Sequence, residues 1–420
     1  MATATNFDRT VKASLFWHNL KCFVAGLIGM FQMIKAAVVG RLTKRGELWE
    51  SEVEFGARIV GYYDAGFGGM LVNLGRRLGM TDYLAKRKER PVSSIEMAEE
   101  MKLKERYVRE WLDAMVVFSI VEADLPNRLY WLPSHRANTL ASFGKPAMAQ
   151  LMEMDCSESN LLNAIGAMFD MAAEVRPDLE RCFQLDGPEG IPYSRYTDFS
   201  EWNTKCAAAN LGRVVTTFVP NLYPGLEQQL KSGITHLDVG CGGAGPTRAL
   251  AKAFPNSTFY GADIGVETLK IAEERAKGEG LTNTHFEVCD ATKLPKEWTS
   301  KFDLVTMFGT LHDLCYPEKG LQECLRVLKP TGRLAVVDPK GHSNVNFNRA
   351  DPMAKSGYAM SLFHCMPIGM SEPSGAGLGT MAGVELLSRL VSQAGFRIIS
   401  AGSGTVKAEP ESTVILAEKS

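Results

Sequence analysis

The sequence predicts an α/β protein in which a seven-stranded doubly wound sheet follows an α-helical winged-helix domain. After Ile234, strand-like runs alternate with amphipathic helices, a spacing that gives a parallel sheet covered on both faces. The last two strand-like runs are joined without a helix, so the final strand should lie antiparallel in the sheet. Between residues 68 and 140, three helical patterns precede a hairpin pattern, which is typical of a winged helix-turn-helix.

The composition is that of a globular protein without a dominant charge. The 420 residues are 45% hydrophobic and 22% charged, and the net charge is −2. The chain as a whole should therefore not be attracted to nucleic acid or to anionic lipid. Its nine cysteines form no CxxC pair. This spacing indicates thiols in a reducing, cytoplasmic compartment and predicts that the chain holds no metal.

The N-terminal segment, residues 1–46, combines basic residues with an apolar run from Cys22 to Ile34. This run is shorter than the roughly 20 apolar residues that a membrane span needs. We interpret the segment as a helix that packs on the rest of the protein. The alternative is a segment that directs the chain to an organelle or binds a membrane surface.

The winged-helix module is predicted from helical patterns at 71–87, 93–101 and 104–120. Its last helix mixes acidic and basic side chains, whereas a helix that enters a DNA groove is more one-sided in charge. We therefore expect the module to mediate dimerisation or to cover a substrate rather than to bind DNA. The charged residues of this helix are Lys104, Glu105, Arg106, Arg109, Glu110 and Asp113.

Residues 148–230 are helical by pattern, except for a break at 185–202. Glycines and prolines interrupt the helix there, and aromatic residues follow. This loop is either a lid over a cofactor or a linker whose aromatic rings pack on a neighbouring element. As a lid, it would bring Tyr193 and Tyr196 to a cofactor and Trp202 to a substrate pocket.

Seven runs in the second half have the composition of strands, and ligands of such a sheet bind beyond the carboxyl ends of its strands. Amphipathic helices are predicted at 265–277 and 318–329. The strand-like runs are residues 234–239, 258–264, 284–290, 302–309, 332–339, 396–402 and 412–418.

A glycine motif follows the first of these strands. Gly240, Gly242 and Gly245 spell GxGxxG, and Asp263 lies at the end of the next strand. This pattern satisfies the dinucleotide fingerprint, so NAD stays a candidate. Asp238 argues for a different ligand, because a carboxylate at the glycine turn would repel a pyrophosphate but suit a positive amino group.

A third acid, Asp290, ends the strand that follows Asp263, where it can accept a hydrogen bond from an adenine amino group. The acids at three successive strand ends suit a ligand that presents an amine, a ribose and an adenine. S-adenosylmethionine is such a ligand. Ala291, beside Asp290, and Phe308, at the end of the fourth strand, are further expected cofactor contacts.

The chain from Ile234 to its end resembles the class I S-adenosylmethionine-dependent methyltransferases. The resemblance lies in HLDVGCGGAG, YGADIGVETL, FEVCDATKLP, FDLVTMFGTLHDL and RVLKPTGRLAVVD. Upstream, KERYVREWLDAMVVFSIVEAD resembles the winged-helix segment of one methyltransferase subgroup, and residues 363–396 look like that subgroup's insertion after the fifth strand. The resemblance implies a methyltransferase sheet and S-adenosylmethionine as cofactor. One departure is that the usual third glycine of the turn is Ala244.

Four segments are expected from these patterns together. Residues 1–55 form a basic and apolar extension, and residues 56–145 form the winged-helix domain. Residues 146–230 form a helical linker with the lid. Residues 231–420 form the catalytic domain that binds S-adenosylmethionine.

The candidate base is His312, which follows the fourth strand at the ligand end of the sheet. Methyl transfer requires the nucleophile in line with the methyl carbon and the sulfur. A hydroxyl nucleophile also needs a base, and an unperturbed imidazole with a pKa near ~6.5 suits neutral pH. The run of Asp303, Met307, His312 and Asp313 resembles, in spacing, the stretch that carries the base histidine in plant-type O-methyltransferases.

The methionine-rich segment 357–370 is expected to line the acceptor pocket, because an insertion at this place covers the ligand edge of the sheet. His364 and Met366 are assigned to this pocket, and packed core is their alternative role.

The leading hypothesis is an enzyme that O-methylates a small molecule. Methylation of a thiol, a thioether or an amine is the alternative within the same family. An NAD-dependent oxidoreductase and a DNA-binding regulator that senses S-adenosylmethionine are the alternatives from other classes. The expected partners are a small-molecule methyl acceptor and a second copy of the chain, with peripheral membrane contact through the N-terminal segment and no nucleic acid.

Overall fold

The computed structural model describes residues 51–144, 161–196, 213–409 and 412–420. Trp202 and residues 1–46 therefore lie outside the described residues. The chain divides into two compact units, residues 1–69 and 70–420. Helix α2 (Glu52–Arg77) begins in the first unit and ends in the second.

The winged-helix module has the predicted hairpin and the second and third of the predicted helices. Ser93 caps the second predicted helix by accepting a hydrogen bond from the Glu96 amide. The prediction of one continuous helix at 71–87 is wrong, because Gly79 adopts a left-handed conformation that separates α2 from the next helix. The elements are α3 (Met80–Lys86), β1 (Val92–Ser93), α4 (Ser94–Met101), α5 (Glu105–Val117), β2 (Glu122–Asp124), β3 (Leu129–Trp131) and α6 (Ser134–Leu140).

The parts of the linker that the structure describes before and after the predicted break are helical. Helix α8 (Leu161–Cys182) ends just before the glycine- and proline-rich loop, and the described part of that loop closes with the short helix η1 (Tyr193–Arg195). The chain then enters the sheet through η2 (Val214–Phe218), α11 (Val219–Leu222) and α12 (Leu226–Ser232).

All seven predicted strands form one sheet, with the order β6-β5-β4-β7-β8-β10-β9. Strands β4 to β8 pair in parallel, and β10 pairs antiparallel with both β8 and β9. The predicted antiparallel final strand is thus confirmed. The strands are β4 (Thr235–Val239), β5 (Thr258–Asp263), β6 (Thr284–Val288), β7 (Phe302–Phe308), β8 (Leu328–Pro339), β9 (Phe396–Ser403) and β10 (Ser412–Lys419).

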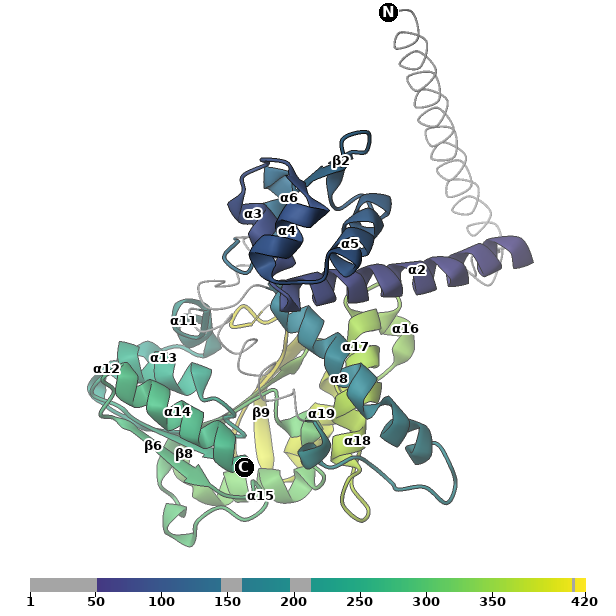
Figure 1. Cartoon of the computed structure of the whole chain (residues 1–420). Helices are drawn as coiled ribbons and strands as arrows, with labels where there is room; N and C mark the ends of the chain where they lie inside the picture. The colour runs from purple at the N-terminus through teal and green to yellow at the C-terminus, as the bar shows by residue number, and fades with distance from the viewer. Residues whose placement is uncertain (1–50, 145–160, 197–212, 410–411) are drawn as a thin grey trace, which may run out of the picture. The chain divides into compact units, whose positions relative to one another are not determined.

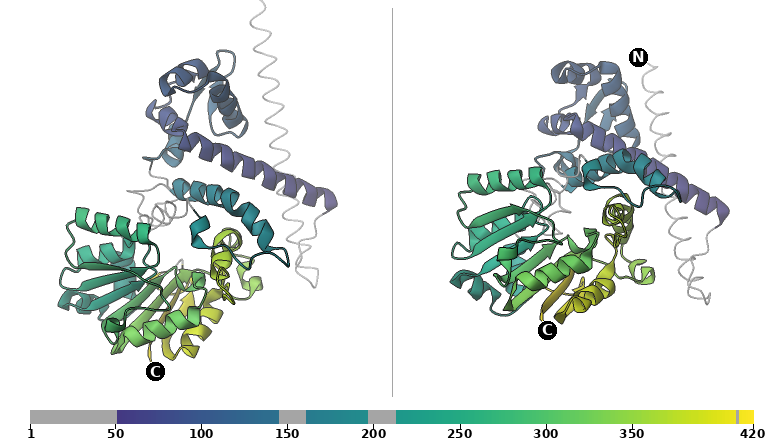
Figure 2. Two further views of the ribbon diagram at one scale, coloured as in Figure 1. Left: turned by 60° about the horizontal axis from the view of Figure 1, so that its bottom comes forward. Right: turned by 90° about the horizontal axis from the view of Figure 1, so that it is seen from below.

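Helices cover both faces of this sheet (Figures 1 and 2). On one face, α11, α12 and α13 (Gly245–Ala253) share a buried apolar cluster with the strands. On the other face, α15 (Pro317–Val327) and α19 (Gly383–Gln393) share a second cluster. Helix α14 (Val266–Gly278) packs its Leu269 and Ala272 against Cys241 and Ala244 of the glycine turn. The turn therefore rests on a well-packed scaffold.

The insertion between β8 and α19 is built from short helices. It packs on the linker, because the Ile191 amide donates to the Pro367 carbonyl at 2.9 Å and the Tyr196 hydroxyl donates to the Phe363 carbonyl at 3.2 Å. The helices are α16 (Val345–Asn348), α17 (Ala354–Met360), η5 (Ser361–Cys365) and α18 (Met366–Gly369).

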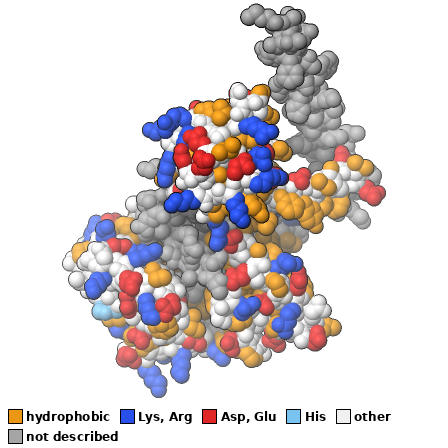
Figure 3. Space-filling model, in the orientation of Figure 1, with side chains coloured by type: hydrophobic (Ala, Val, Ile, Leu, Met, Phe, Trp, Pro, Cys, Tyr) orange, Lys and Arg blue, Asp and Glu red, His pale blue; other side chains and the backbone are white. Residues whose placement is uncertain are grey.

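The surface carries mixed charge. On the face shown in Figure 3, basic and acidic side chains are interspersed over the described residues. In the part of the chain that the structure describes, no helix has the length and apolar character needed to cross a membrane.

Candidate functional site

The glycine motif forms a tight turn between β4 and α13. Gly240 and Gly242 have φ angles of 72° and 51°, which side chains rarely adopt. A Cβ on Gly240 would lie 2.2 Å from Thr310 Cγ2, so the close approach of the chain after β7 also requires glycine there. Ala244, where the resemblance leads one to expect glycine, has a φ of 52° as well. The departure in sequence therefore leaves the left-handed turn intact.

Asp263 links this turn to the end of β5. Its carboxylate accepts hydrogen bonds from the Gly242 and Gly265 amides, each at 2.8 Å. Burial raises the pKa of Asp263, and these backbone donors oppose the rise. The backbone around the glycine turn is thus held by the acid that was assigned to ribose hydroxyls.

Asp238 lies beneath the turn rather than on its surface. Its side chain is only 1% exposed, and its two oxygens accept hydrogen bonds from Thr247 Oγ1 at 2.8 Å and Thr306 Oγ1 at 3.2 Å. Two hydroxyls, on α13 and β7, thus hold this carboxylate, and its role toward a positive amino group stays a prediction. Burial raises the pKa of Asp238 to about 7.

The third acid, Asp290, is exposed after the end of β6, and its Oδ1 accepts from the Thr292 amide at 2.8 Å. Ala291 next to it is partly buried against the cluster that contains α15 and α19. Phe308 ends β7 and contacts the Phe218 ring edge-on at 5.2 Å. A cofactor role for these residues stays a prediction.

His312 lies at the carboxyl end of β7, in the short helix η4 (Leu311–Asp313), and is 4% exposed. Its Nδ1 lies 2.9 Å from Asp338 Oδ1, at the end of β8. Its Nε2 lies 3.3 Å from Asp313 Oδ1. Burial lowers the pKa of His312, but the charges of Asp313 and Asp338 prevail and raise it well above its ordinary value. The histidine is thus held between two carboxylates.

Asp313 also has neighbours on the linker and on the insertion. The Tyr193 hydroxyl donates to Asp313 Oδ2 at 3.1 Å. Desolvation and the charge of Asp313 raise the pKa of Tyr193 well above its ordinary value, so its hydroxyl stays a donor. Cys365 Sγ accepts a hydrogen bond from Thr380 Oγ1 at 3.0 Å. His312, Asp313 and Cys365 each have one atom of a kind that can bind a metal ion, and these three atoms lie within 4.8 Å of one another. The prediction that the chain holds no metal stays a prediction.

His364 is buried between two aromatic rings. Tyr193 and Tyr196 meet its imidazole edge-on, at centroid distances of 6.0 and 4.9 Å. Desolvation lowers the pKa of His364 to about 4, so the ring is neutral at physiological pH. The structure therefore brings Tyr193, Tyr196 and His364 together beside Asp313. Met366 is half-buried at the start of α18, and its assignment to the pocket stays a prediction.

Sequence reasoning missed Asp338 and Thr306. The same rule that selected Asp238, Asp263 and Asp290, an acid at the carboxyl end of a strand, would have selected Asp338 in LAVVDP. Thr306 has no comparable signal, because a threonine within an apolar strand is common.

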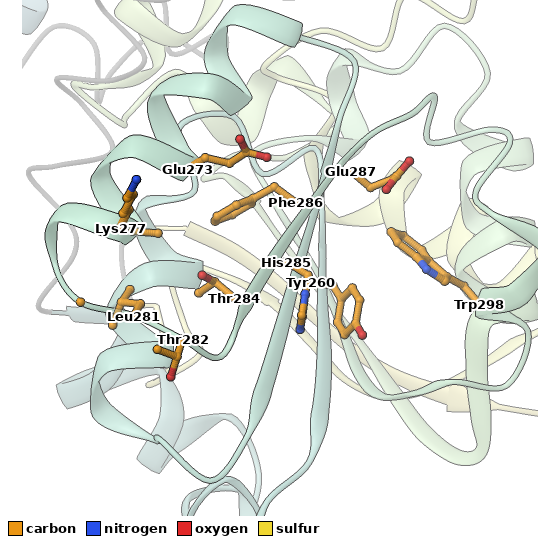
Figure 4. A pocket seen from close by; sticks show the side chains of 12 residues that line it. Tyr260, Glu273, Lys277, Leu281, Thr282, Thr284, His285, Phe286, Glu287 and Trp298 are labelled. Carbon is orange, nitrogen blue, oxygen red and sulfur yellow. The ribbon is translucent and has the colours of Figure 1, made fainter.

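A pocket of about 690 Å³ opens elsewhere, at the edge strand β6 (Figure 4). Tyr260, His285 and Trp298 lie on one side of this strand, and Thr284 and Phe286 lie on the other. None of the predicted site residues lines this pocket. The candidate site is therefore the cluster at the carboxyl ends of β4, β5, β7 and β8.

Two segments of the chain match known domain families. Residues 230–366 match the family described as "Methyltransferase domain", and residues 66–142 match the "Rv2258c-like winged HTH domain". The first match covers strands β4 to β8 of the sheet and most of the insertion, and the second covers the winged-helix module.

Curated relatives are similar over part of their length. Methyltransferase GfsG from Streptomyces halstedii is 28% identical over 180 residues, which cover 42% of this chain and 62% of that protein. Demethylmenaquinone methyltransferase from Staphylococcus carnosus is 35% identical over 141 residues, covering 33% of this chain and 54% of that protein. The chain thus spans a little over half the length of these relatives.

Solved structures share the fold over most of the chain. A putative O-methyltransferase from Nostoc punctiforme has a TM-score of 0.63 at 19% identity, covering 88% of this chain and 100% of that one. Human N-acetylserotonin methyltransferase has a TM-score of 0.60 at 17% identity, covering 88% and 98%. With the antiparallel strand β10 between β8 and β9, these likenesses show that the chain has the fold of the class I methyltransferases, and its residues 66–142 and 230–366 match the two domain families named above.

Proposed function

We propose that this protein transfers a methyl group from S-adenosylmethionine to a hydroxyl oxygen of a small-molecule acceptor, with His312 as the base. The observation that carries this proposal is the buried pair of His312 and Asp338 at the carboxyl ends of β7 and β8. The pair lies next to the glycine turn, because Thr310, two residues before His312, packs on Gly240.

The residues of the turn fit the proposed cofactor. Gly240 and Gly242 present backbone without side chains, and Asp263 and Asp290 supply carboxylates at the ends of β5 and β6. Asp263 and Asp290 would hold the ribose and adenine, and Asp238 would favour the amino group from beneath the turn. When bound, the cofactor supplies a methyl group on a positively charged sulfur.

The chain's own residues would move one proton. Asp338 accepts the Nδ1 hydrogen of His312 and thereby leaves Nε2 to face the acceptor hydroxyl. Asp313 Oδ1 lies 3.3 Å from Nε2, and its charge favours the protonated ring. An acceptor hydroxyl that takes the place of Asp313 removes one of the two charges that hold this proton. Asp338 then stabilises the imidazolium that forms on proton transfer.

Carbon methylation is the second candidate. The ubiquinone/menaquinone biosynthesis C-methyltransferase UbiE of Burkholderia vietnamiensis is 29% identical to this chain over 142 residues, which cover 34% of this chain and 54% of that protein. Removal of a proton from a ring hydroxyl by the same histidine would make the neighbouring ring carbon nucleophilic. The atom methylated therefore depends on how the acceptor is oriented, whereas the base is common to both reactions.

The other parts of the chain have proposed roles as well. We assign residues 1–55, 56–145, 146–230 and 231–420 to the extension, the winged-helix domain, the linker with lid and the catalytic domain. In the winged helix, Arg106 pairs with Glu110 and Arg109 with Glu105, which supports dimerisation or substrate covering rather than DNA binding. The six cysteines that the structure describes are free thiols, which supports a cytoplasmic location over an organelle or membrane surface.

The first experiment is calorimetric titration of the full chain with S-adenosylhomocysteine, with NADH as a parallel titrant. We expect micromolar binding of S-adenosylhomocysteine and none of NADH. Asp263→Ala removes the carboxylate that holds the turn and should abolish this binding. Binding of NADH alone would refute the proposed cofactor and, with it, methyl transfer.

A further inference from the structure

A chain of buried polar side chains runs beneath the glycine turn and is not used by the proton transfer proposed above. His236 Nε2 lies 2.9 Å from Thr306 Oγ1, which lies 3.2 Å from Asp238 Oδ1, and Asp238 Oδ2 accepts from Thr247 Oγ1 at 2.8 Å. His236 and the two threonines are 0% exposed, and Asp238 is 1% exposed. These hydrogen bonds join β4, β7 and α13 at the point where the turn begins.

The direction of these hydrogen bonds follows from the two nitrogens of His236. Desolvation lowers the pKa of His236 to about 3, so its ring is neutral and carries one hydrogen. Among the described residues, Nδ1 has no hydrogen-bond partner. A buried N–H without an acceptor is rarer than an acceptor without a donor, so the hydrogen belongs on Nε2. His236 therefore donates to Thr306.

This direction decides what Thr306 does. A hydroxyl has one hydrogen, and with its oxygen already accepting from His236, Thr306 directs that hydrogen to Asp238 Oδ1. Successive bonds of this kind polarise and strengthen one another in a low-dielectric interior. Asp238 thus receives two hydroxyl donors, which favour its charged form against the burial that disfavours it. Without His236, the Thr306 hydroxyl is free to accept from a protonated Asp238 instead.

The surroundings of His236 would also suit an apolar side chain. His236 lies on β4, whose Leu237 and Val239 are fully buried, and its ring meets the Phe259 ring of β5 edge-on at 5.6 Å. A polar ring at such a place costs stability unless its hydrogen bond is used. The one bond that His236 makes within the described residues leads to the acid beneath the cofactor turn.

We propose that His236 is a positioning residue of the cofactor site, which acts through Thr306 to keep Asp238 charged beneath the turn and thereby favours binding of the cofactor's ammonium group. This inference rests on the proposed function. It assigns the selectivity for the amino-acid end of the cofactor to a buried histidine on β4. Gly240 and Gly242, which follow Asp238 in the turn, carry no side chains that would separate a ligand from its backbone.

The test compares two ligands that differ at this end. S-adenosylhomocysteine carries the ammonium group, whereas 5′-methylthioadenosine has the same adenosine and thioether but lacks the amino acid. Calorimetry on the full-length His236→Phe variant should show binding of S-adenosylhomocysteine weakened by about tenfold or more. Binding of 5′-methylthioadenosine should change by less than about twofold, because that ligand has no ammonium group to lose its partner.

Further variants keep the test decisive. Thr306→Val should reproduce the selective loss if His236→Phe does not fold, and His236→Gln, which restores a donor, should recover part of the affinity. His285→Phe on β6 is the matched control, because His285 stacks on Tyr260 and takes no part in the hydrogen bonds that lead from His236 to Asp238. This variant should bind both ligands as the wild type does. An equal loss for both ligands, or no loss, would overturn the positioning role. Failure of the wild type to bind S-adenosylhomocysteine would instead refute the proposed function, and the wild-type titration reports that separately.

Discussion

At the scale of single residues, the contacts of His312 set the pH range in which the imidazole can act. Asp338 holds Nδ1, and Asp313 faces Nε2, the nitrogen that must receive the acceptor's proton. Burial by itself favours the neutral ring, but the two carboxylates raise the pKa of His312 well above its ordinary value of 6.5. The ring must therefore lose a proton before it can serve as a base.

We expect kcat/KM, for an acceptor found by screening phenols, to rise with pH through an inflection above 6.5. Asp313→Asn removes the negative charge at Nε2, so the inflection should move toward lower pH. The measurement is the pH profile of kcat/KM for both proteins. Glu267→Gln, on the exposed face of α14, is the control and should leave the profile unchanged.

Two outcomes would contradict this account. An inflection that stays in place in Asp313→Asn would mean that a group other than His312 titrates. An inflection that persists in His312→Ala would have the same meaning, because that variant has no imidazole at this position.

At the scale of elements, the Glu385 carboxylate holds residues 342 and 343, which follow β8 at the start of the insertion. Glu385, in the first turn of α19, accepts from the Ser343 amide and contacts His342 Nδ1, each at 2.8 Å. The Ser343 hydroxyl donates in turn to the Ala382 carbonyl at 2.7 Å. These contacts hold the start of the segment that carries His364.

Glu385→Gln should lower the free energy of unfolding at neutral pH by about 1 kcal/mol. This is less than a buried charged hydrogen bond contributes, because the Glu385 side chain is 45% exposed. Desolvation raises its pKa, but the Ser343 amide and His342 outweigh that and lower the pKa of Glu385 to about 2. The contribution is therefore present above the unfolded-state pKa of about 4.3 and is lost as the pH falls toward 2.

The measurement is urea denaturation of Glu385→Gln and the wild type at several pH values. The difference in free energy should shrink progressively below about pH 4. Glu267→Gln, whose partner Lys270 is also exposed, should differ little from the wild type at any pH. If the free energies of unfolding of Glu385→Gln and the wild type differ by the same amount at every pH, the lowered pKa of Glu385 does not contribute to stability.

The sequence predicted elements well where a long periodic pattern was uninterrupted. The strands of the sheet and helices α14 and α15 have such patterns, and each was predicted within a few residues, apart from β8, which begins four residues early. The helix at 71–87 was divided by Gly79, because one left-handed residue is enough to end a helix without disturbing the apolar pattern. The short helices of the insertion carry too few residues to show a period.

At the scale of the whole molecule, the sheet depends on its final strand. β10 lies between β8 and β9 and pairs with both, and its residues from Thr413 to Ala417 are buried. Its loss would leave two unpaired strand edges in the interior of the sheet. The last strand in sequence is thus an interior strand of the sheet, next to the edge strand β9.

Deletion of residues 412–420 should therefore abolish cooperative unfolding, although it removes only the end of the chain. Urea denaturation followed by near-ultraviolet circular dichroism measures this. Deletion of Ser420 alone, which lies after β10, is the control and should leave the transition unchanged. A cooperative transition in the longer deletion would mean that β8 and β9 can pair without β10.

The sequence by itself determined the strands, the glycine turn and the acids at the ends of β4, β5 and β6, because periodicity and turn chemistry are local properties of the chain. Only the tertiary structure decided which side chains meet. It placed Asp338 against His312, Tyr193 against Asp313, and Asp238 beneath the turn. These contacts join residues on different elements, and their distances are set by how the strands pair and how the helices pack on them.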